Sequence, residues 1–167
     1  SQISALTTDQ VVAIETGDIA ALSTAAIMAL STVAISALTT GQIAALTTKQ
    51  IAAIETRDVA VLSTNQVAAL TINQLGALTT GQVRALNTDA VAALGTSGIA
   101  ALSTAALSAL TTATIAGLTT EQVVALTTAQ MAALKTSQIS VLSTDQLVAI
   151  ETGDIAALGT AAIAAVP

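Results

Sequence analysis

The chain has 167 residues, of which 53% are apolar and 8% charged, and it contains no Phe, Tyr, Trp, Cys or His. Globular domains usually carry roughly 25% charged residues and bury much of their area with aromatic side chains, so this composition predicts thin, closely packed layers of small elements. Ten acidic and four basic residues give a net charge of −6 with no basic patch, which excludes a nucleic-acid partner; disulfides, zinc–thiolate sites and thiol nucleophiles are excluded as well.

An eight-residue repeat organises the whole chain. Residues 1–6 match the last six positions of this repeat, and twenty gapless octads then run from Thr7 to Val166. A typical octad, residues 39–46, reads Thr-Thr-Gly-Gln-Ile-Ala-Ala-Leu. We therefore expect residues 1–167 to form one continuous repeat array that starts inside a repeat, with Pro167 stopping the last helix.

Each octad position tolerates its own set of residues. Position 5 is aliphatic or Met in all twenty octads, position 8 is Leu or Ile except at Val166, and position 7 is Ala in seventeen. Position 2 is Thr in nineteen octads, with Ile72 the exception, whereas position 3 accepts residues of every class and position 6 accepts Arg84. This pattern predicts that positions 2, 5 and 8 line the interior and that positions 3 and 6 face water.

A helix interrupted once in every octad fits this pattern best. Eight residues at 100° each advance 800°, so the apolar stripe of an unbroken helix would drift by about 80° per octad. A break in each octad returns every short apolar face to the same side. We therefore predict an all-α solenoid of very short helices, one per octad, in about twenty repeats. A β-solenoid with Thr ladders is the alternative, because short apolar runs suit strands as well.

Residues suited to start a helix stand at the beginning of each octad. Ser or Thr at position 1 with Gln at position 4 reads as a capping box, as in Thr119 and Gln122, while Thr at position 2 is also a good N-cap. The sequence leaves the choice between positions 1 and 2 open. The acceptance of Ile72 at position 2 suggests that the methyl group at this position faces the interior. The number of octads per turn is also open; with two per turn, the rod would be about 90 Å long.

Acidic pairs recur along the chain in octads 2, 7 and 19, as Glu15/Asp18, Glu55/Asp58 and Glu151/Asp154. Asp at position 4 favours the positive end of a helix dipole, and this explanation is preferred to calcium binding, which needs six or more oxygen ligands. Each acidic pair stands alone between neutral octads, so no metal site is expected.

Few other residues can carry chemistry. Met28 and Met131 are the only conceivable haem ligands, and Met131 occupies a core position. Lys49, Arg57, Arg84 and Lys135 are interpreted as solvated surface residues, and the Ser and Thr residues lack a nearby base. We therefore expect no catalytic, cofactor-binding or metal-binding residue, no cofactor, no small-molecule substrate and no enzymatic activity.

No membrane span is expected, because polar residues interrupt the apolar runs every few positions, as at Ser23-Thr24 and Ser31-Thr32. The N-terminus also lacks the features of a signal peptide.

The motif Leu-Thr-Thr-x-Gln-Ile-Ala-Ala, at residues 38–45 and 46–53, resembles repeat regions of large bacterial surface or secreted proteins. These regions are often labelled as haem-utilisation or adhesion proteins. The resemblance covers the whole chain and implies an extended module that is extracellular or on the bacterial cell surface. Haem binding finds no support among the residues present.

These observations favour a structural repeat module, an extended stalk or spacer or a filament-forming segment of an adhesin-like protein. Solenoids need polar terminal repeats to stay apart, and neither end of this chain differs from its middle, so we expect end-to-end self-association into rods or filaments. The alternative function is a surface-binding array, such as an ice-binding face of regularly spaced Thr. Because Thr at position 2 is expected to face inward and position 1 holds several residue types, the outward Thr side chains would not be regularly spaced.

Overall fold

The computed structural model describes residues 2–150 and 152–164, and it shows an all-α solenoid. A short 3₁₀ helix (η1, Gln2–Ala5) precedes a series in which every octad supplies one helix of four to seven residues. The described residues contain no β-strand. The predicted solenoid of short helices is therefore confirmed, and the β-solenoid alternative is wrong.

The helices are numbered by octad, so that α1 belongs to the octad starting at Thr7. They span α1 Thr8–Val12, α2 Thr16–Ala21, α3 Thr24–Met28, α4 Thr32–Ala37, α5 Thr40–Ala45, α6 Thr48–Ala53, α7 Thr56–Val59, α8 Thr64–Ala68, α9 Ile72–Gly76, α10 Thr80–Ala85, α11 Thr88–Ala92, α12 Gly95–Ala101, α13 Thr104–Ala109, α14 Thr112–Ala116, α15 Thr120–Val124, α16 Thr128–Ala133, α17 Thr136–Ile139, α18 Thr144–Ala149, α19 Thr152–Ala157 and α20 Thr160–Ile163.

Position 1 of the octad is the N-cap, which decides the question that the sequence left open. Thr39 has an extended backbone (φ −69°, ψ 159°), and its hydroxyl accepts a hydrogen bond from the backbone N–H of Gln42 at 3.1 Å. The Gln42 side-chain oxygen accepts in return from the backbone N–H of Thr39 at 2.9 Å, which completes the capping box. Position 2 is then the first helical residue, and its hydroxyl is not needed to start the helix.

Octad 15 offers a direct test of this assignment. Thr119 Oγ1 accepts from the backbone N–H of Gln122 at 3.2 Å, whereas Thr120 is an exposed first helical residue. We expect Thr119→Ala to lower the free energy of unfolding by about 1 kcal/mol, because it removes a helix cap. Thr120→Ala should change it by less than about 0.5 kcal/mol in the same urea titration. The reverse order of the two losses would move the cap to position 2.

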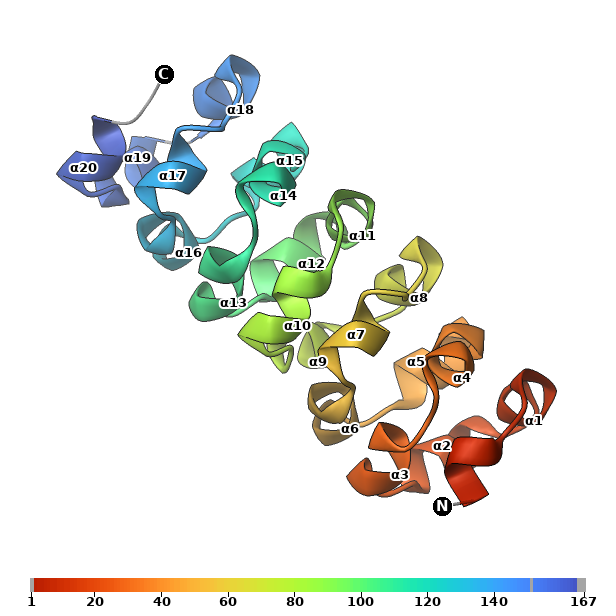
Figure 1. Ribbon diagram of the computed structural model, residues 1–167. Helices are drawn as coiled ribbons and strands as arrows, with labels where there is room; N and C mark the ends of the chain where they lie inside the picture. The colour runs from red at the N-terminus through yellow and green to blue at the C-terminus, as the bar shows by residue number, and fades with distance from the viewer. Residues whose placement is uncertain (1, 151, 165–167) are drawn as a thin grey trace.

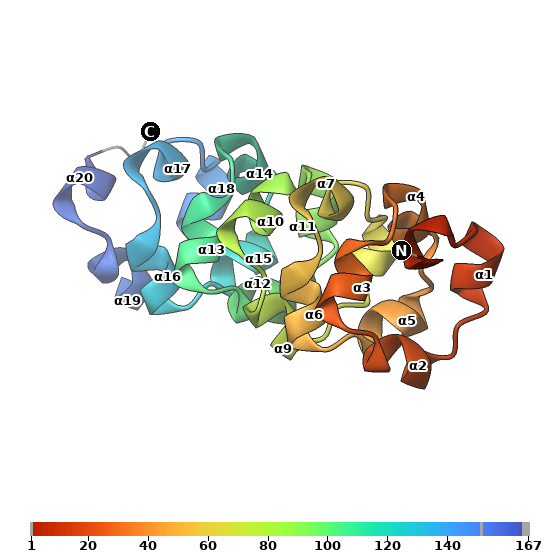
Figure 2. The same ribbon diagram turned by 60° about the horizontal axis from the view of Figure 1, so that its bottom comes forward.

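Between three and four octads complete one turn of the solenoid. Each helix packs against the helix three octads away, as α2 does on α5 and α10 on α13, while Gln side chains reach back four octads. The turns stack along one axis, with the two ends of the described chain at opposite ends of an elongated body (Figures 1 and 2). Twenty octads therefore make five to seven turns, and at about 9 Å per layer the rod is roughly 50 Å long. The 90 Å estimate, which assumed two octads per turn, was too long.

The core consists of positions 4, 5 and 8 of successive octads. Ile43 and Leu46 are typical of positions 5 and 8, and both are buried. The prediction that position 2 lines the interior is wrong: most Thr residues there are exposed, and 53% of Ile72 is accessible. Two helical residues turn the chain by about 200°, so position 2 points almost opposite to the buried position 4. Ile72 is accepted because it lies in solvent, not because its methyl groups are buried.

Gln at position 4 links the turns to one another. Gln74 accepts at Oε1 from the backbone N–H of Thr71 at 2.7 Å and donates from Nε2 to the carbonyls of Ile43 at 2.8 Å and Leu46 at 2.6 Å. One amide thus caps its own helix and also bonds the end of the octad four places earlier. Buried glutamines occupy this position in nine octads: Gln42, Gln50, Gln66, Gln74, Gln82, Gln122, Gln130, Gln138 and Gln146.

A seam without these amide bridges crosses the middle of the solenoid. Octads 11–14 carry, at position 4, the residues Ala90, Gly98, Ala106 and Thr114. Consequently, in this described part of the chain, no Gln side chain bonds octads 7–10 from the following turn. The connection into α12 also differs, since Leu94 is helical (φ −64°, ψ −22°) where other octads are extended, and Gly95 has φ +64°. A side chain at position 95 would be strained in this left-handed conformation.

Candidate functional site

One of the three acidic pairs, Glu55/Asp58, takes part in the packing of neighbouring turns. Asp58 is buried and accepts a hydrogen bond at 2.6 Å from the hydroxyl of Thr32, which lies three octads earlier. Arg57 contacts Glu55 at 2.7 Å and approaches Asp58 with its Nε at 3.8 Å. Asp58 is thus positioned at a helix start, as expected, and it also joins α7 to α4.

The other acidic pairs are more open. Asp18 is exposed in the first turn and Asp154 is half-buried, while Glu151 lies outside the described residues. Over residues 2–150 and 152–164, no group of three or more acidic side chains comes together in a way that could hold a metal ion.

The two methionines do not form a haem site. Met131 is fully buried at position 5 of octad 16, as the sequence predicted, and Met28 is half-exposed at position 6 of octad 3. Thirteen octads separate them, so they cannot ligate one iron together. Haem therefore does not fit the side chains that this chain offers.

The Ser and Thr hydroxyls at position 1 act as helix caps. Ser103, for example, accepts from the backbone N–H of Ala106 at 3.1 Å, and Thr127 accepts from that of Gln130 at 3.2 Å. Among the described residues, every buried side-chain nitrogen and oxygen has a hydrogen-bond partner. The buried polar groups are thus used for the fold.

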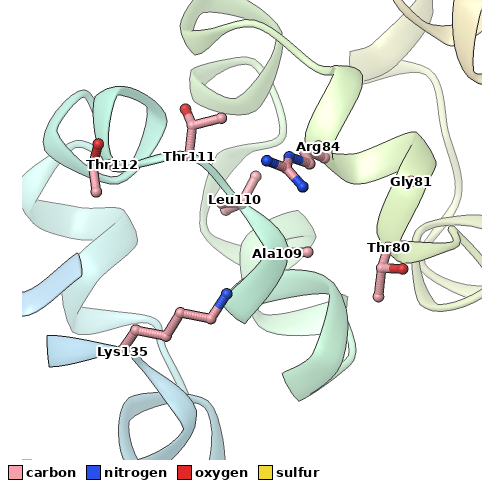
Figure 3. Close-up of a pocket in the computed structure, with 8 residues that line it drawn as sticks. All are labelled: Thr80, Gly81, Arg84, Ala109, Leu110, Thr111, Thr112 and Lys135. Carbon is pink, nitrogen blue, oxygen red and sulfur yellow. The ribbon is translucent and has the colours of Figure 1, made fainter. Parts of the chain in front are cut away.

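Two of the four basic residues line a hollow on the side of the solenoid (Figure 3). It has a volume of about 470 Å³ and is lined by Arg84 and Lys135 together with Thr80, Gly81 and residues 109–112. Both cationic side chains extend toward the segment that carries Ala109 and Leu110, from opposite sides of it (Figure 3). Lys49 and Arg57 do not line this hollow.

Three consecutive turns build this hollow. Arg84 is at position 6 of octad 10, Leu110 ends octad 13, and Lys135 begins octad 17. These steps of three and four octads are those that stack one turn on the next. Within the described residues, neither the Arg84 nor the Lys135 side chain makes an ion pair or a hydrogen bond.

The sequence analysis placed Arg84 and Lys135 on the surface as separate charges; both are exposed, but it did not show that they line the same hollow. One signal was present, because each departs from the residue that is usual at its octad position: Ala at position 6 and Ser or Thr at position 1. Their separation of seven octads becomes meaningful only when the number of octads per turn is known.

A second hollow, of about 300 Å³, opens at the C-terminal end of the core. It is lined only by aliphatic residues, Leu147, Ile150, Ile155, Leu158 and Ile163. Ile155 and Ile163 occupy position 5, which is buried in the middle of the chain, yet they are 41% and 44% exposed here. Within the described residues, the side chains at position 5 are therefore less covered here than in the middle of the solenoid.

No helix in the described residues has the length and apolar character needed to traverse a bilayer.

Comparison with known proteins identifies the repeat. The model of a family described as the ALTTAQ repeat matches residues 11–48, 51–88, 73–104, 80–112 and 99–136. No curated protein and no solved structure matches the chain. The family matches overlap and together cover residues 11–48 and 51–136, well over half of the chain, in the region where the capping boxes and amide bridges recur. The chain therefore belongs to the ALTTAQ repeat family.

Proposed function

We propose that this repeat module sets a length, acting as a stalk, spacer or filament-forming segment of an adhesin-like protein that is secreted or displayed on the bacterial surface. The observation that carries this proposal is the Gln bridge between turns. Because each bridge bonds only the neighbouring turn, as Gln82 does with Ile51 and Ile54, a turn can be added without changing the others. The surface or secreted location is supported by the resemblance of the LTTxQIAA motif alone.

We also propose end-to-end association, which features of the two end faces support. The C-terminal face exposes Ile155 and Ile163. At the other end, Gln10 caps its own helix through Oε1, which accepts from the backbone N–H of Thr7 at 2.9 Å. Its Nε2 has no hydrogen-bond partner among the described residues and can donate to carbonyls at the C-terminal face of a second copy. The same contact that links turns within one chain would then link chains.

We expect a chain in which residues 119–150 are duplicated to be longer but no thicker. These four octads each carry a Gln that can bond the preceding copy, and their duplication adds about one turn, or roughly 10 Å. Small-angle X-ray scattering would show the longest dimension rising by that amount while the cross-sectional radius stays constant. Light scattering of the original chain over a concentration series should show the mass rising above that of a monomer.

Two results would contradict these expectations. Growth of the cross-section on duplication would mean that the added octads form a separate body, which would remove the length-setting function. A monomer mass that does not change with concentration would remove the end-to-end association while leaving the stalk in place.

An ice-binding face is the second candidate, and one observation favours it. Most Thr residues at position 2 are exposed, as Thr40 and Thr120 are, so the earlier objection that this rank faces inward no longer applies. Against it, successive octads turn around the solenoid axis, so the Thr residues of consecutive octads point to different sides of the rod, and only about every third octad adds one to the same side. Thermal hysteresis in a solution of the chain would support this candidate, and its absence would leave the stalk.

A further inference from the structure

We propose that the hollow between α10, α13 and α17 binds a small ligand bearing a tetrahedral oxyanion, either a phosphate ester or a sulfate ester. This inference goes beyond the proposed stalk function, which needs no ligand. It depends on Arg84 and Lys135 both lining one cavity of about 470 Å³, with the segment of Ala109 and Leu110 between them (Figure 3). That volume is in the usual range for small-molecule sites.

Two independent departures from the repeat lie at this hollow. Position 6 carries Arg only at residue 84, and position 1 carries Lys only at residue 135. Lys135 replaces a capping hydroxyl, so α17 begins without a side-chain cap bond from position 1. A helix cap contributes about 1 kcal/mol, so the lysine lowers the stability of its own octad. Glu15 and Glu55 also start their helices without this bond, so it is the position of the Lys135 ammonium group at the hollow that points to binding.

The electrostatic setting makes the two charges distinctive. The chain has a net charge of −6, so it does not attract anions in general. Arg57, by contrast with Arg84, is neutralised by Glu55 and Asp58. The hollow therefore presents two unneutralised cations on an otherwise acidic protein, and a ligand carrying negative charge is its natural complement.

The shape and chemistry of the lining indicate the ligand class. A guanidinium group presents paired N–H donors that match the oxygens of phosphate and sulfate, and a lysine ammonium adds a point charge. The Thr80 and Thr112 hydroxyls have no hydrogen-bond partner within the described residues and can bond the hydroxyls of the remaining molecule. The Thr111 hydroxyl is engaged with Thr114, at 2.8 Å between their Oγ1 atoms. A small sugar ester fits these donors.

The test is a titration of the full chain, followed by NMR, with glucose 6-phosphate and glucose 6-sulfate, and with glucose as the neutral probe. We expect both esters to shift the amide signals of Gly81 and Thr111, and glucose to shift neither. Tighter binding of the phosphate would identify a phosphate ester as the ligand, and equal or tighter binding of the sulfate would identify a sulfate ester. Shifts spread over the whole chain, or none, would overturn the proposal.

Variants that restore the usual octad residues separate local binding from general charge. Arg84→Ala and Lys135→Thr should each weaken binding by about tenfold, because each removes one charge-assisted contact. Lys49→Ala, which removes the same charge at an exposed position 3 outside the hollow, should leave the affinity unchanged. Equal weakening by all three variants would show that no specific site exists. Misfolding is not expected to obscure the result, since both test variants match residues found elsewhere in the repeat.

Discussion

Replacing Gln74 by Ala is expected to lower the free energy of unfolding by about 3 kcal/mol. The substitution removes hydrogen bonds to the carbonyls of Ile43 and Leu46 and to the backbone N–H of Thr71, and it leaves the two carbonyls without this donor in a buried layer. Urea unfolding followed by far-UV circular dichroism measures the loss, since the helical signal is free of aromatic contributions in this chain.

Gln10→Ala is the matched control for this variant. Gln10 caps its own helix as Gln74 does, but it is exposed, and its Nε2 bonds no carbonyl among the described residues. Its loss should cost no more than a helix cap, about 1 kcal/mol. If the two variants lost equal stability, the amide bridge between turns would contribute nothing beyond capping.

Gln74→Glu should make the free energy of unfolding depend on pH. A carboxylate facing the Ile43 and Leu46 carbonyls in a buried layer would have its pKa raised above the usual value near 4.3, because burial and the carbonyl dipoles disfavour its charge. The variant should be least stable relative to the original chain at neutral pH. The difference should shrink as the pH falls through the raised pKa of the folded state, since the protonated group can donate to one carbonyl again.

The repeat period allowed much of the fold to be predicted, because capping and helical geometry act within one octad. The capping box of Thr119 and Gln122 and the burial of Met131 both follow from local spacing, and both are confirmed. The bridge from Gln74 to Ile43 spans 31 residues and depends on how many octads make a turn. No local pattern sets that number, so the second half of each amide's role was missed.

The predicted burial of position 2 was wrong for a different reason. The near-constant Thr was interpreted as a buried rank, yet the side chain is exposed because the helix turns it away from position 4. Restricted choice at a position does not by itself imply burial. Two of these Thr residues contact a later turn. Thr32 donates a hydrogen bond to Asp58, and the methyl group of Thr88 lies so close to Gly117 that a Cβ atom at residue 117 would clash with it. The contacts between octads three apart therefore constrain position 2 from outside the core.

Ile43→Ala is expected to cost about 3–4 kcal/mol, because it empties a fully buried site in the middle of the solenoid. Ile163→Ala makes the same change at the same octad position, but 44% of that side chain is exposed on the open C-terminal face. Its cost in dilute solution should be below about 1 kcal/mol. Urea titration of the two variants compares the middle of the core with its end, with side-chain chemistry and helix position held constant.

Measuring the same two variants over a range of protein concentrations tests the proposed association. If copies stack end to end, the neighbouring molecule covers Ile163. Ile163→Ala should then reduce the rise in mass with concentration that light scattering measures. Ile43→Ala should not reduce this rise under conditions in which the variant is folded. Equal loss of stability in both variants at the lowest concentration would mean that the C-terminal face is already covered within a single chain. In that case the open end would not exist, and association would need a different surface.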